Sequence, residues 1–278
     1  MKTKFLIWTT AVVLTLFSAV FQRLTGPTYP LKGRFTWDGR VYTYKFPRTH
    51  AGAGGLIVAI PLLPQADTAQ LVWKRYKTND EWTRVEMQRQ SDVMTAELPH
   101  QPPAGKLEYH IEIRRGDEIL LLPVKENVVI RFRNDVPAWA LIPHILLMFF
   151  AMLFSTAAGL SALTRLQPLS GKIKWTIILL FFGGFIFGPL VQKYAFGEWW
   201  TGFPLGTDLT DNKTLIAFLI WLVAGYLWRR NPQRRFVVVA AAVVTLIVFM
   251  IPHSLHGSEL DYSKLEKEGQ AVVIRQQD

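Results

Sequence analysis

Long apolar runs alternate along this chain with polar stretches of different periodicity. Five runs contain no Asp, Glu, Lys or Arg, and they cover Phe5–Gln22, Val136–Leu163, Trp175–Val191, Thr214–Trp228 and Phe236–Ile251. A membrane-spanning helix needs about 20 mostly apolar residues, and about 17 suffice when flanking charged side chains reach the interface. The sequence therefore predicts five membrane spans, of which the fourth is the shortest.

The first apolar run has two interpretations. Lys2 and Lys4 followed by an apolar stretch also describe a secretory signal peptide. The stretch is long for a signal peptide, and no clear small-x-small cleavage site precedes Arg23. We therefore expect residues 1–22 to be an uncleaved transmembrane anchor.

Between the first two runs the pattern changes to a two-residue alternation. It is clearest in Lys106–Arg115, where apolar residues fill one face and polar residues, including His110 and Glu112, fill the other. Similar runs occur at 34–37, 42–46, 56–60, 71–76, 82–87, 93–98, 119–122 and 128–132, with turn residues between them. About seven to nine short strands at this spacing predict a β-sandwich over residues 23–135.

Four segments of this region carry a resemblance. Leu71–Tyr76, Trp82–Met87, Ala96–Pro99 and Ala104–Tyr109 together look like an immunoglobulin or fibronectin type III-like module of about 100 residues. The resemblance implies a domain that presents a surface to a protein partner or acts as a spacer. It indicates no particular ligand, because such folds host many unrelated functions.

The charges predict an orientation. Nine cations and no acid flank one end of the runs: Lys2, Lys4, Arg165, Lys172, Lys174, Arg229, Arg230, Arg234 and Arg235. All 21 acidic residues fall on the other side. Because short cytoplasmic loops are enriched in Lys and Arg, we expect a bacterial inner-membrane protein with a cytoplasmic N-terminus, and with residues 23–135 and the C-terminus in the periplasm.

The net charge of +10 then reflects topology and contact with anionic lipid head groups. The cations are split among short turns, so we expect no nucleic-acid partner. The chain has no cysteine, which excludes disulfides, thiolate metal sites and covalent c-type haem attachment.

The candidate chemistry lies in a repeated tripeptide, Ile-Pro-His, at 142–144 and 251–253. Both copies fall in apolar segments toward the predicted outer face. Two imidazoles across a helical bundle could hold haem b or a metal, because a neutral ring nitrogen is the donor that axial ligation requires. Alternatively, His144 donates to a carbonyl freed by a proline kink and His253 lies in the head-group region.

A tryptophan-rich segment, residues 193–213, separates the two histidines and carries Trp199, Trp200 and Asp208. This layout faintly resembles haem-handling proteins of cytochrome c assembly, and the resemblance implies a cofactor site made by these three residues with the two histidines. That family's Trp-Asp-Pro-Lys-Glu-Thr-Trp signature is absent, and Asp208-Leu-Thr-Asp-Asn-Lys-Thr214 stands in its place. Tryptophans also suit a membrane interface for purely structural reasons. A metal site is a further alternative, built from Glu198, Asp208, Asp211, Glu259 and Asp261 with His253 or His256.

The sequence thus predicts an α+β membrane protein. A β-sandwich lies between a transmembrane anchor (1–22) and a four-helix transmembrane bundle (136–256), and an external polar tail follows (257–278). No nucleophile arrangement or nucleotide loop is recognisable, so the first hypothesis is a non-enzymatic scaffold or accessory subunit with a protein partner. The second is a b-type haem-binding or haem-handling protein that uses His144 and His253. A transporter is disfavoured, because no span contains a charged residue.

Overall fold

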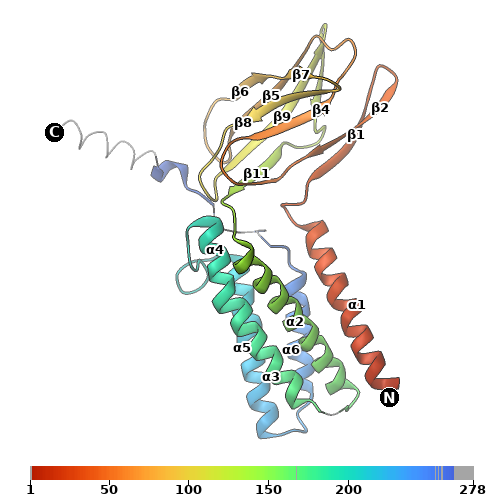
Figure 1. Ribbon diagram of the computed structural model, residues 1–278, viewed down its shortest axis with the longest axis vertical. Helices are drawn as coiled ribbons and strands as arrows, with labels where there is room; N and C mark the ends of the chain where they lie inside the picture. Colours follow the sequence, from red (N-terminus) through yellow and green to blue (C-terminus); the bar gives the residue numbers. More distant parts are fainter. Residues whose placement is uncertain (1, 167, 254, 256, 258, 266–278) are drawn as a thin grey trace, which may run out of the picture. The chain divides into compact units, whose positions relative to one another are not determined.

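The computed structural model describes residues 2–166, 168–253, 255, 257 and 259–265. The chain divides into two compact units (Figure 1). Unit 1 comprises residues 1–27 and 136–258, and unit 2 comprises residues 28–135 and 259–278. Unit 1 is helical and unit 2 is built of strands, so the mixed α+β class and the β-rich region are as the sequence predicts. Residues 266–278 of the predicted tail lie outside the described residues.

Unit 2 contains eleven strands among its described residues: β1 (Leu31–Trp37), β2 (Arg40–Phe46), β3 (Thr49–Ala51), β4 (Leu56–Pro61), β5 (Thr68–Arg75), β6 (Thr83–Glu86), β7 (Gln88–Gln90), β8 (Val93–Leu98), β9 (Lys106–Arg115), β10 (Glu118–Leu122) and β11 (Val128–Arg133). They form a two-stranded sheet β1-β2, a six-stranded sheet β3-β11-β9-β5-β6 with β10 also paired to β9, and a three-stranded sheet β4-β8-β7. All three sheets contribute side chains to one hydrophobic core.

Strand β9 has the predicted bounds and the predicted inward face. Leu107, Tyr109, Ile111 and Ile113 are fully buried. The polar face differs from the prediction, because Glu112 is also buried and the His110 side chain is mostly covered. His110 packs edge-on against Trp82 with ring centroids 5.0 Å apart, and Glu112 lies among His110, Arg84 and Arg114. Glu112 and His110 are therefore covered, although the side chains of Arg84 and Arg114 remain about half exposed.

The two-residue pattern did not predict two short strands, β3 and β7. β3 directly precedes the glycine-rich residues 52–55, and β7 follows β6 after a single residue. β3 pairs in parallel with β11, joining His50 to Phe132 in register. Three-residue strands carry too few positions for an alternation to be visible, so their pairing depends on tertiary context.

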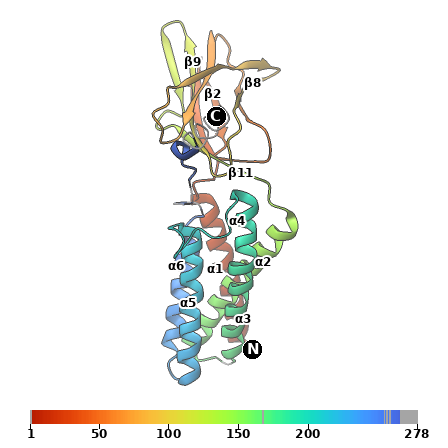
Figure 2. The same ribbon diagram turned by 90° about the vertical axis from the view of Figure 1, so that its left-hand side faces the viewer.

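Unit 1 contains α1 (Lys2–Thr25), α2 (Ala138–Leu163), α3 (Ser170–Leu180), a π-helix η1 (Phe181–Phe187), α4 (Gly188–Phe196), α5 (Leu209–Arg230) and α6 (Phe236–Met250). Three helical stretches among the described residues are long and apolar enough to cross a membrane: α1, α2 and the continuous Ser170–Phe196. α6 is apolar but shorter. Figure 2 shows α5 beside α6, and the two helices pack together.

Small residues bring these helices close. A Cβ placed on Gly159 of α2 would lie 2.5 Å from the Cβ of Ala242 on α6, and one on Gly184 would lie 2.5 Å from Cγ2 of Thr214 on α5. Trp221 of α5 is fully buried and donates from Nε1 to Oγ1 of Thr245 on α6 at 2.8 Å. Close backbone approach and such inter-helix hydrogen bonds hold apolar helices together where lipid supplies no hydrophobic driving force.

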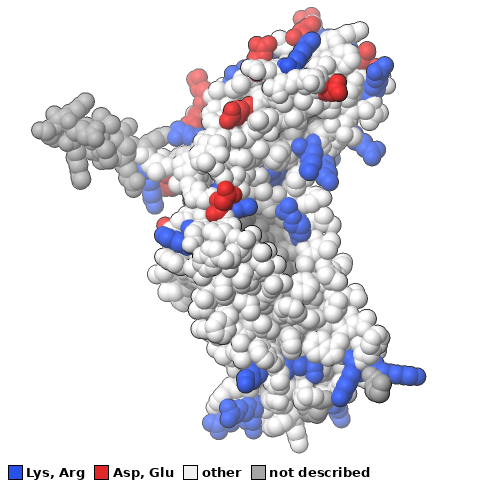
Figure 3. Space-filling view, viewed as in Figure 1, with Lys and Arg blue, Asp and Glu red and all other residues white. Residues whose placement is uncertain are grey.

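The charged residues of unit 1 are unevenly placed. Along the middle of the helices the visible surface is free of Lys, Arg, Asp and Glu, and at one end Lys and Arg gather without any acid in view (Figure 3). That end carries the first residues of α1, α3 and α6 and the last residues of α2 and α5, which include Lys4, Lys172 and Arg230. The opposite end carries the last turns of α1, α4 and α6.

Candidate ligand site between α1, α2 and α6

A cavity of about 200 Å³ lies within unit 1 where α1 and α6 pack against α2. Both sequence-predicted histidines, His144 and His253, line it. The other lining residues come from α1 (Thr15, Ser18, Ala19 and Gln22), from α2 (Ile145, Met148, Phe149 and Met152) and from α6 (Phe249). The two Ile-Pro-His tripeptides therefore meet at one site although they are more than 100 residues apart in sequence.

His144 is oriented by the π-helix. Its Nδ1 lies 2.9 Å from the carbonyl oxygen of Gly183, in the middle of η1. A carbonyl can only accept, so Nδ1 carries the hydrogen, and in the neutral imidazole Nε2 presents a lone pair. The absence of a side chain on Gly183 lets η1 approach α2 closely, because a Cβ there would lie 2.9 Å from Sδ of Met148. A histidine fixed through one nitrogen is well suited to bind a ligand with the other.

The end of α6 positions His253. Ile251 is the C-cap of α6 and adopts an extended conformation, and Pro252 prevents the helix from continuing. The carbonyls left at this end accept from other helices. Gln22 of α1 donates from Nε2 to the oxygens of Phe249 (2.6 Å) and Ile251 (3.0 Å), and Lys213 of α5 donates from Nζ to Ile251 (2.7 Å).

His253 follows directly on this junction. It retains an exposed surface although it borders the cavity. Lys213 lies close to this junction, because its Nζ contacts the carbonyl of Ile251, two residues before His253. Two imidazoles, one buried lysine and the polar end of a helix thus meet at the same end of unit 1.

The loop between α4 and α5 is ordered by the first turn of α5. Asp211, which is buried, accepts at Oδ2 from the backbone N–H of Thr201 (2.7 Å), from its hydroxyl (3.2 Å) and from the N–H of Gly202 (3.1 Å). The next residue, Asn212, accepts from the N–H of Phe203 at 2.6 Å. These side chains pin the loop to the helix N-terminus, where negative charge is favourable.

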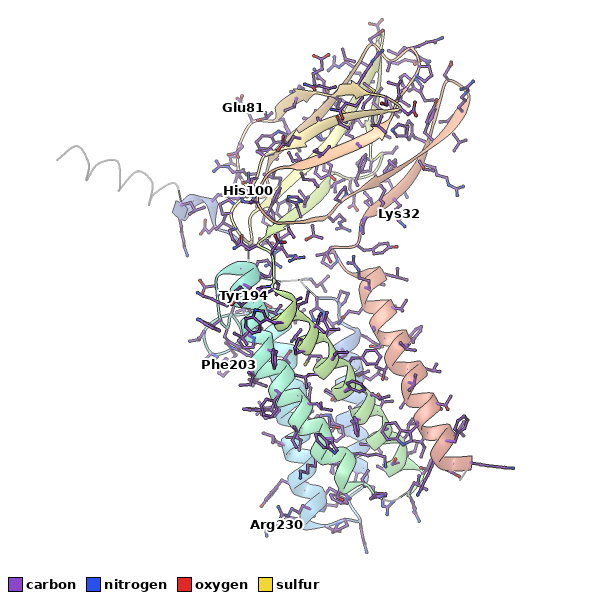
Figure 4. The ribbon with its side chains drawn as sticks, viewed as in Figure 1. Lys32, Glu81, His100, Tyr194, Phe203 and Arg230 are labelled. Atoms are coloured by element: carbon purple, nitrogen blue, oxygen red, sulfur yellow. The ribbon has the colours of Figure 1, made fainter. Side chains whose placement is uncertain are left out.

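Trp199, Trp200 and Asp208, which the sequence grouped with the histidines, lie in or beside this loop and are absent from the described lining of the cavity. Asp208 is the N-cap of α5 and accepts from the N–H of Thr210 at 2.7 Å. Trp200 stacks on Phe185 and donates from Nε1 to Phe203, while Trp199 is exposed with the Lys193 ammonium 5.8 Å from its ring centre. Figure 4 labels Tyr194 and Phe203, which bracket these tryptophans along the chain.

Sequence reasoning overlooked the contribution of α1. Thr15, Ser18 and Gln22 recur at three- and four-residue spacing, so they share one helix face, and they are polar in an otherwise apolar run. That spacing was the available signal. Among the residues that the structure describes, the hydroxyl of Thr15 is buried and has no hydrogen-bond partner. A buried polar group without a partner is unfavourable, and a bound ligand is one way to satisfy it.

The size of the cavity bears on the cofactor. Pockets that enclose a drug-sized ligand measure about 300–1,000 Å³, and a haem macrocycle is larger than such a ligand. At about 200 Å³ the cavity is smaller than a haem macrocycle, so the haem b expected from the histidine pair would need space outside it. A carboxylate-based metal site also lacks support, because no group of three His, Asp or Glu suited to a metal occurs among the described residues. His256 lies outside the described residues.

A second hollow, in unit 2, joins the residues after β5 to the start of the tail. It has a volume of about 620 Å³ and is lined by residues 75–80 and 259–263. Glu259 accepts from Lys106 (2.6 Å) and Lys77 (2.8 Å). Burial raises the pKa of this carboxyl, but the two lysines outweigh that effect and hold it below its usual value. Burial raises the pKa of Tyr262 to about 12. These contacts anchor the described part of the tail on unit 2.

Comparisons with known proteins identify no relative: no family model, no curated protein and no solved structure matches this chain.

Proposed function

We propose that this chain is an accessory membrane protein that binds a small ligand through His144 and His253. The observation that carries the proposal is that both imidazoles line one cavity, with Nδ1 of His144 committed to the Gly183 carbonyl. In this arrangement the helices of unit 1 make five membrane spans, the last four of them a bundle, and unit 2 is an immunoglobulin-like β-sandwich. The single shared core of its three sheets supports that assignment.

The proposal includes an orientation in a bacterial inner membrane. The cationic end of unit 1 (Figure 3) faces the cytoplasm under the positive-inside rule. The histidine cavity, at the opposite end of the helices, then lies near the periplasmic face. A titratable side chain inside an apolar bundle is energetically costly. Its presence there supports a functional role for His144.

The experiment is a ligand survey of the full-length protein purified in mild detergent. Metal content, the visible absorption spectrum and the organic-solvent extract are measured for wild type, for His144→Ala and for His253→Ala. The matched control is His100→Ala, an exposed histidine of unit 2. We expect a bound species in wild type and in the control that is depleted in both cavity variants. If wild type neither carries nor takes up haem, metal or an organic ligand, the proposal fails.

A second candidate function, docking of a protein partner, is supported by β10. Among the described strands β10 pairs only with β9, so its other edge offers backbone N–H and C=O groups. Its outward side chains Ile119 and Leu121 are 54% and 46% exposed. An exposed apolar edge strand is a template for strand addition by a partner.

Leu121→Lys tests this docking surface. We expect a partner that co-purifies in mild detergent to be lost in this variant and retained in Val41→Lys, which changes an exposed apolar residue of the separate β1-β2 sheet. Equal retention in both variants would remove β10 from consideration.

A further inference from the structure

We infer that the ligand of the histidine cavity is the ring of a quinone or quinol head group, an inference that rests on the proposed function. The volume of the cavity suits a single ring. An apolar cavity of about 150 Å³ is known to hold one benzene molecule. The cavity between α1, α2 and α6, at about 200 Å³, therefore has room for one six-membered ring with oxygen substituents.

The side chains that line the cavity are complementary to a quinone or quinol ring. Ile145, Phe149 and Phe249 provide apolar surface for the faces of a ring. Polar groups line the same cavity and are complementary to the ring's oxygens. Nε2 of His144 can accept from a hydroxyl, and the Thr15 hydroxyl, which is covered in this structure, can donate to a carbonyl after rotation about its Cα–Cβ bond. A mainly apolar pocket with a few oriented polar groups is the usual form of a small-molecule site.

The cavity suits a neutral ring better than a metal ion. Met148 and Met152 line the cavity with the two histidines, and thioether with imidazole ligands would suit Cu(I). Two features oppose a cation. The cavity is far larger than an ion bound directly by its ligands, and the positive ammonium group of Lys213 lies at the same helix end as His253, 2.7 Å from the Ile251 carbonyl. A neutral ring with partly negative oxygens is compatible with both features.

A lipid-soluble molecule has a route into the cavity. Ile145 lines the cavity and is also 53% exposed, and its neighbours Ile142 and Leu146 are exposed apolar residues. The cavity thus borders an apolar outer surface of α2, which the proposed function places in lipid. A lipid-soluble molecule can enter from the bilayer with its head group in the cavity and its tail among the acyl chains.

The test uses the full-length protein in lipid nanodiscs and a short-chain ubiquinone with one isoprene unit as the probe, with binding measured by calorimetric titration. Three variants are compared with wild type. Thr15→Val removes the unpartnered hydroxyl at nearly constant volume. Ala19→Phe places a ring in the cavity from an exposed position of α1. Ser155→Ala is the matched control, because its hydroxyl is also buried and without a partner among the described residues but lies outside the cavity lining.

We expect saturable binding to wild type and to Ser155→Ala, a Kd raised at least threefold in Thr15→Val, and no binding to Ala19→Phe with an unchanged thermal midpoint. The inference is overturned if wild type does not bind the probe, or if Thr15→Val and Ala19→Phe bind it as wild type does. Haem or copper bound in a His144-dependent manner would overturn the quinone assignment and leave the proposed function intact. Absence of every ligand class would overturn both.

Discussion

Lys213 on α5 donates a 2.7 Å hydrogen bond from Nζ to the carbonyl oxygen of Ile251, the last residue before the Pro-His pair that follows α6. Gln22 on α1 donates to the same oxygen at 3.0 Å. One carbonyl at the end of α6 therefore connects three helices and fixes the position of the backbone just before His253. The geometry of the cavity depends on this junction as much as on the residues that line it.

Replacing Lys213 and Gln22 together should show that they act through one acceptor. We expect Lys213→Met to lower the free energy of unfolding by about 1–3 kcal/mol, and Gln22→Leu to lower it by a similar amount. The double variant should depart from additivity by at least about 0.5 kcal/mol, because each donor partly satisfies the carbonyl when the other is absent. Urea unfolding of the full chain in detergent, followed by tryptophan fluorescence, measures all three.

Lys193→Met is the control for that cycle. Lys193 also donates from Nζ to a backbone carbonyl, that of Gly197 at 2.5 Å, but the bond is exposed. Its loss should change the free energy of unfolding by less than about 0.5 kcal/mol. Strict additivity of the Lys213 and Gln22 effects would show that the shared carbonyl does not couple them.

Gly202 should be essential to the loop between α4 and α5. A Cβ at this position would lie 2.6 Å from the Cβ of Asp211 and 2.9 Å from Oδ1 of Asn212. Gly202→Ala therefore pushes the loop away from the two side chains that pin it, at a cost of about 1–3 kcal/mol. Limited proteolysis of the full chain should then cut within residues 197–208 faster than in wild type.

Gly171→Ala supplies the comparison for Gly202→Ala. A Cβ at Gly171 meets nothing within 4 Å, and the residue lies in the first turn of α3. Its proteolysis pattern should match wild type. A Gly202→Ala chain as resistant as wild type would mean that the loop is held by other contacts.

The sequence predicted those features that depend on local pattern. Apolar runs without charges gave helices close to the observed bounds, and the alternation in 106–115 gave β9 with its buried face. The repeated Ile-Pro-His identified the two cavity histidines. The remaining lining residues could not be ranked, because Gln22 and Thr15 acquire a role only when α1 packs against α2 and α6. Trp200 and Asp208 belonged to the predicted site but are absent from the described lining of the cavity: Trp200 stacks on Phe185, and Asp208 accepts from Thr210 as the N-cap of α5.

Glu112 should contribute to stability more than a typical surface acid. Its side chain is 11% exposed and lies 3.3–3.5 Å from Arg114, Arg84 and His110. Burial raises its pKa, but hydrogen bonds from His110 and Arg114 and the charge of Arg84 outweigh burial and leave the pKa below its usual value. The charged form is thus favoured in the fold.

We therefore expect Glu112→Gln to lower the free energy of unfolding by about 1.5–3 kcal/mol, the range of a hydrogen bond to a charged group. Glu118→Gln is the matched control, because Glu118 pairs with Arg115 at 2.9 Å while its side chain is 74% exposed. Exposed pairs contribute about 0–1 kcal/mol. Urea unfolding at neutral pH and constant ionic strength compares the two, and equal effects would contradict a special role for the covered network.

Asp80 gives a prediction with a defined pH dependence. Its carboxylate accepts from Nε of Arg75 at 2.6 Å and from Nη2 at 2.8 Å, and these hydrogen bonds lower its pKa. The pKa in the unfolded chain is about 3.9, so the folded value lies below that of the unfolded state. The pair then contributes stability fully at pH values above the unfolded pKa, and this contribution disappears as the pH falls through the folded pKa.

The measurement is the difference in free energy of unfolding between wild type and Asp80→Asn across a pH series on the full chain. We expect a constant difference of about 1 kcal/mol from pH 5 to pH 8, and a difference that shrinks progressively below about pH 4. Asp38→Asn is the control, since Asp38 lies 3.8 Å from Arg115 and both side chains are well exposed; it should stay near zero throughout. A difference for Asp80 that persists at pH 2, or grows as the pH falls, would show that the carboxylate form is not what the Arg75 pair stabilises.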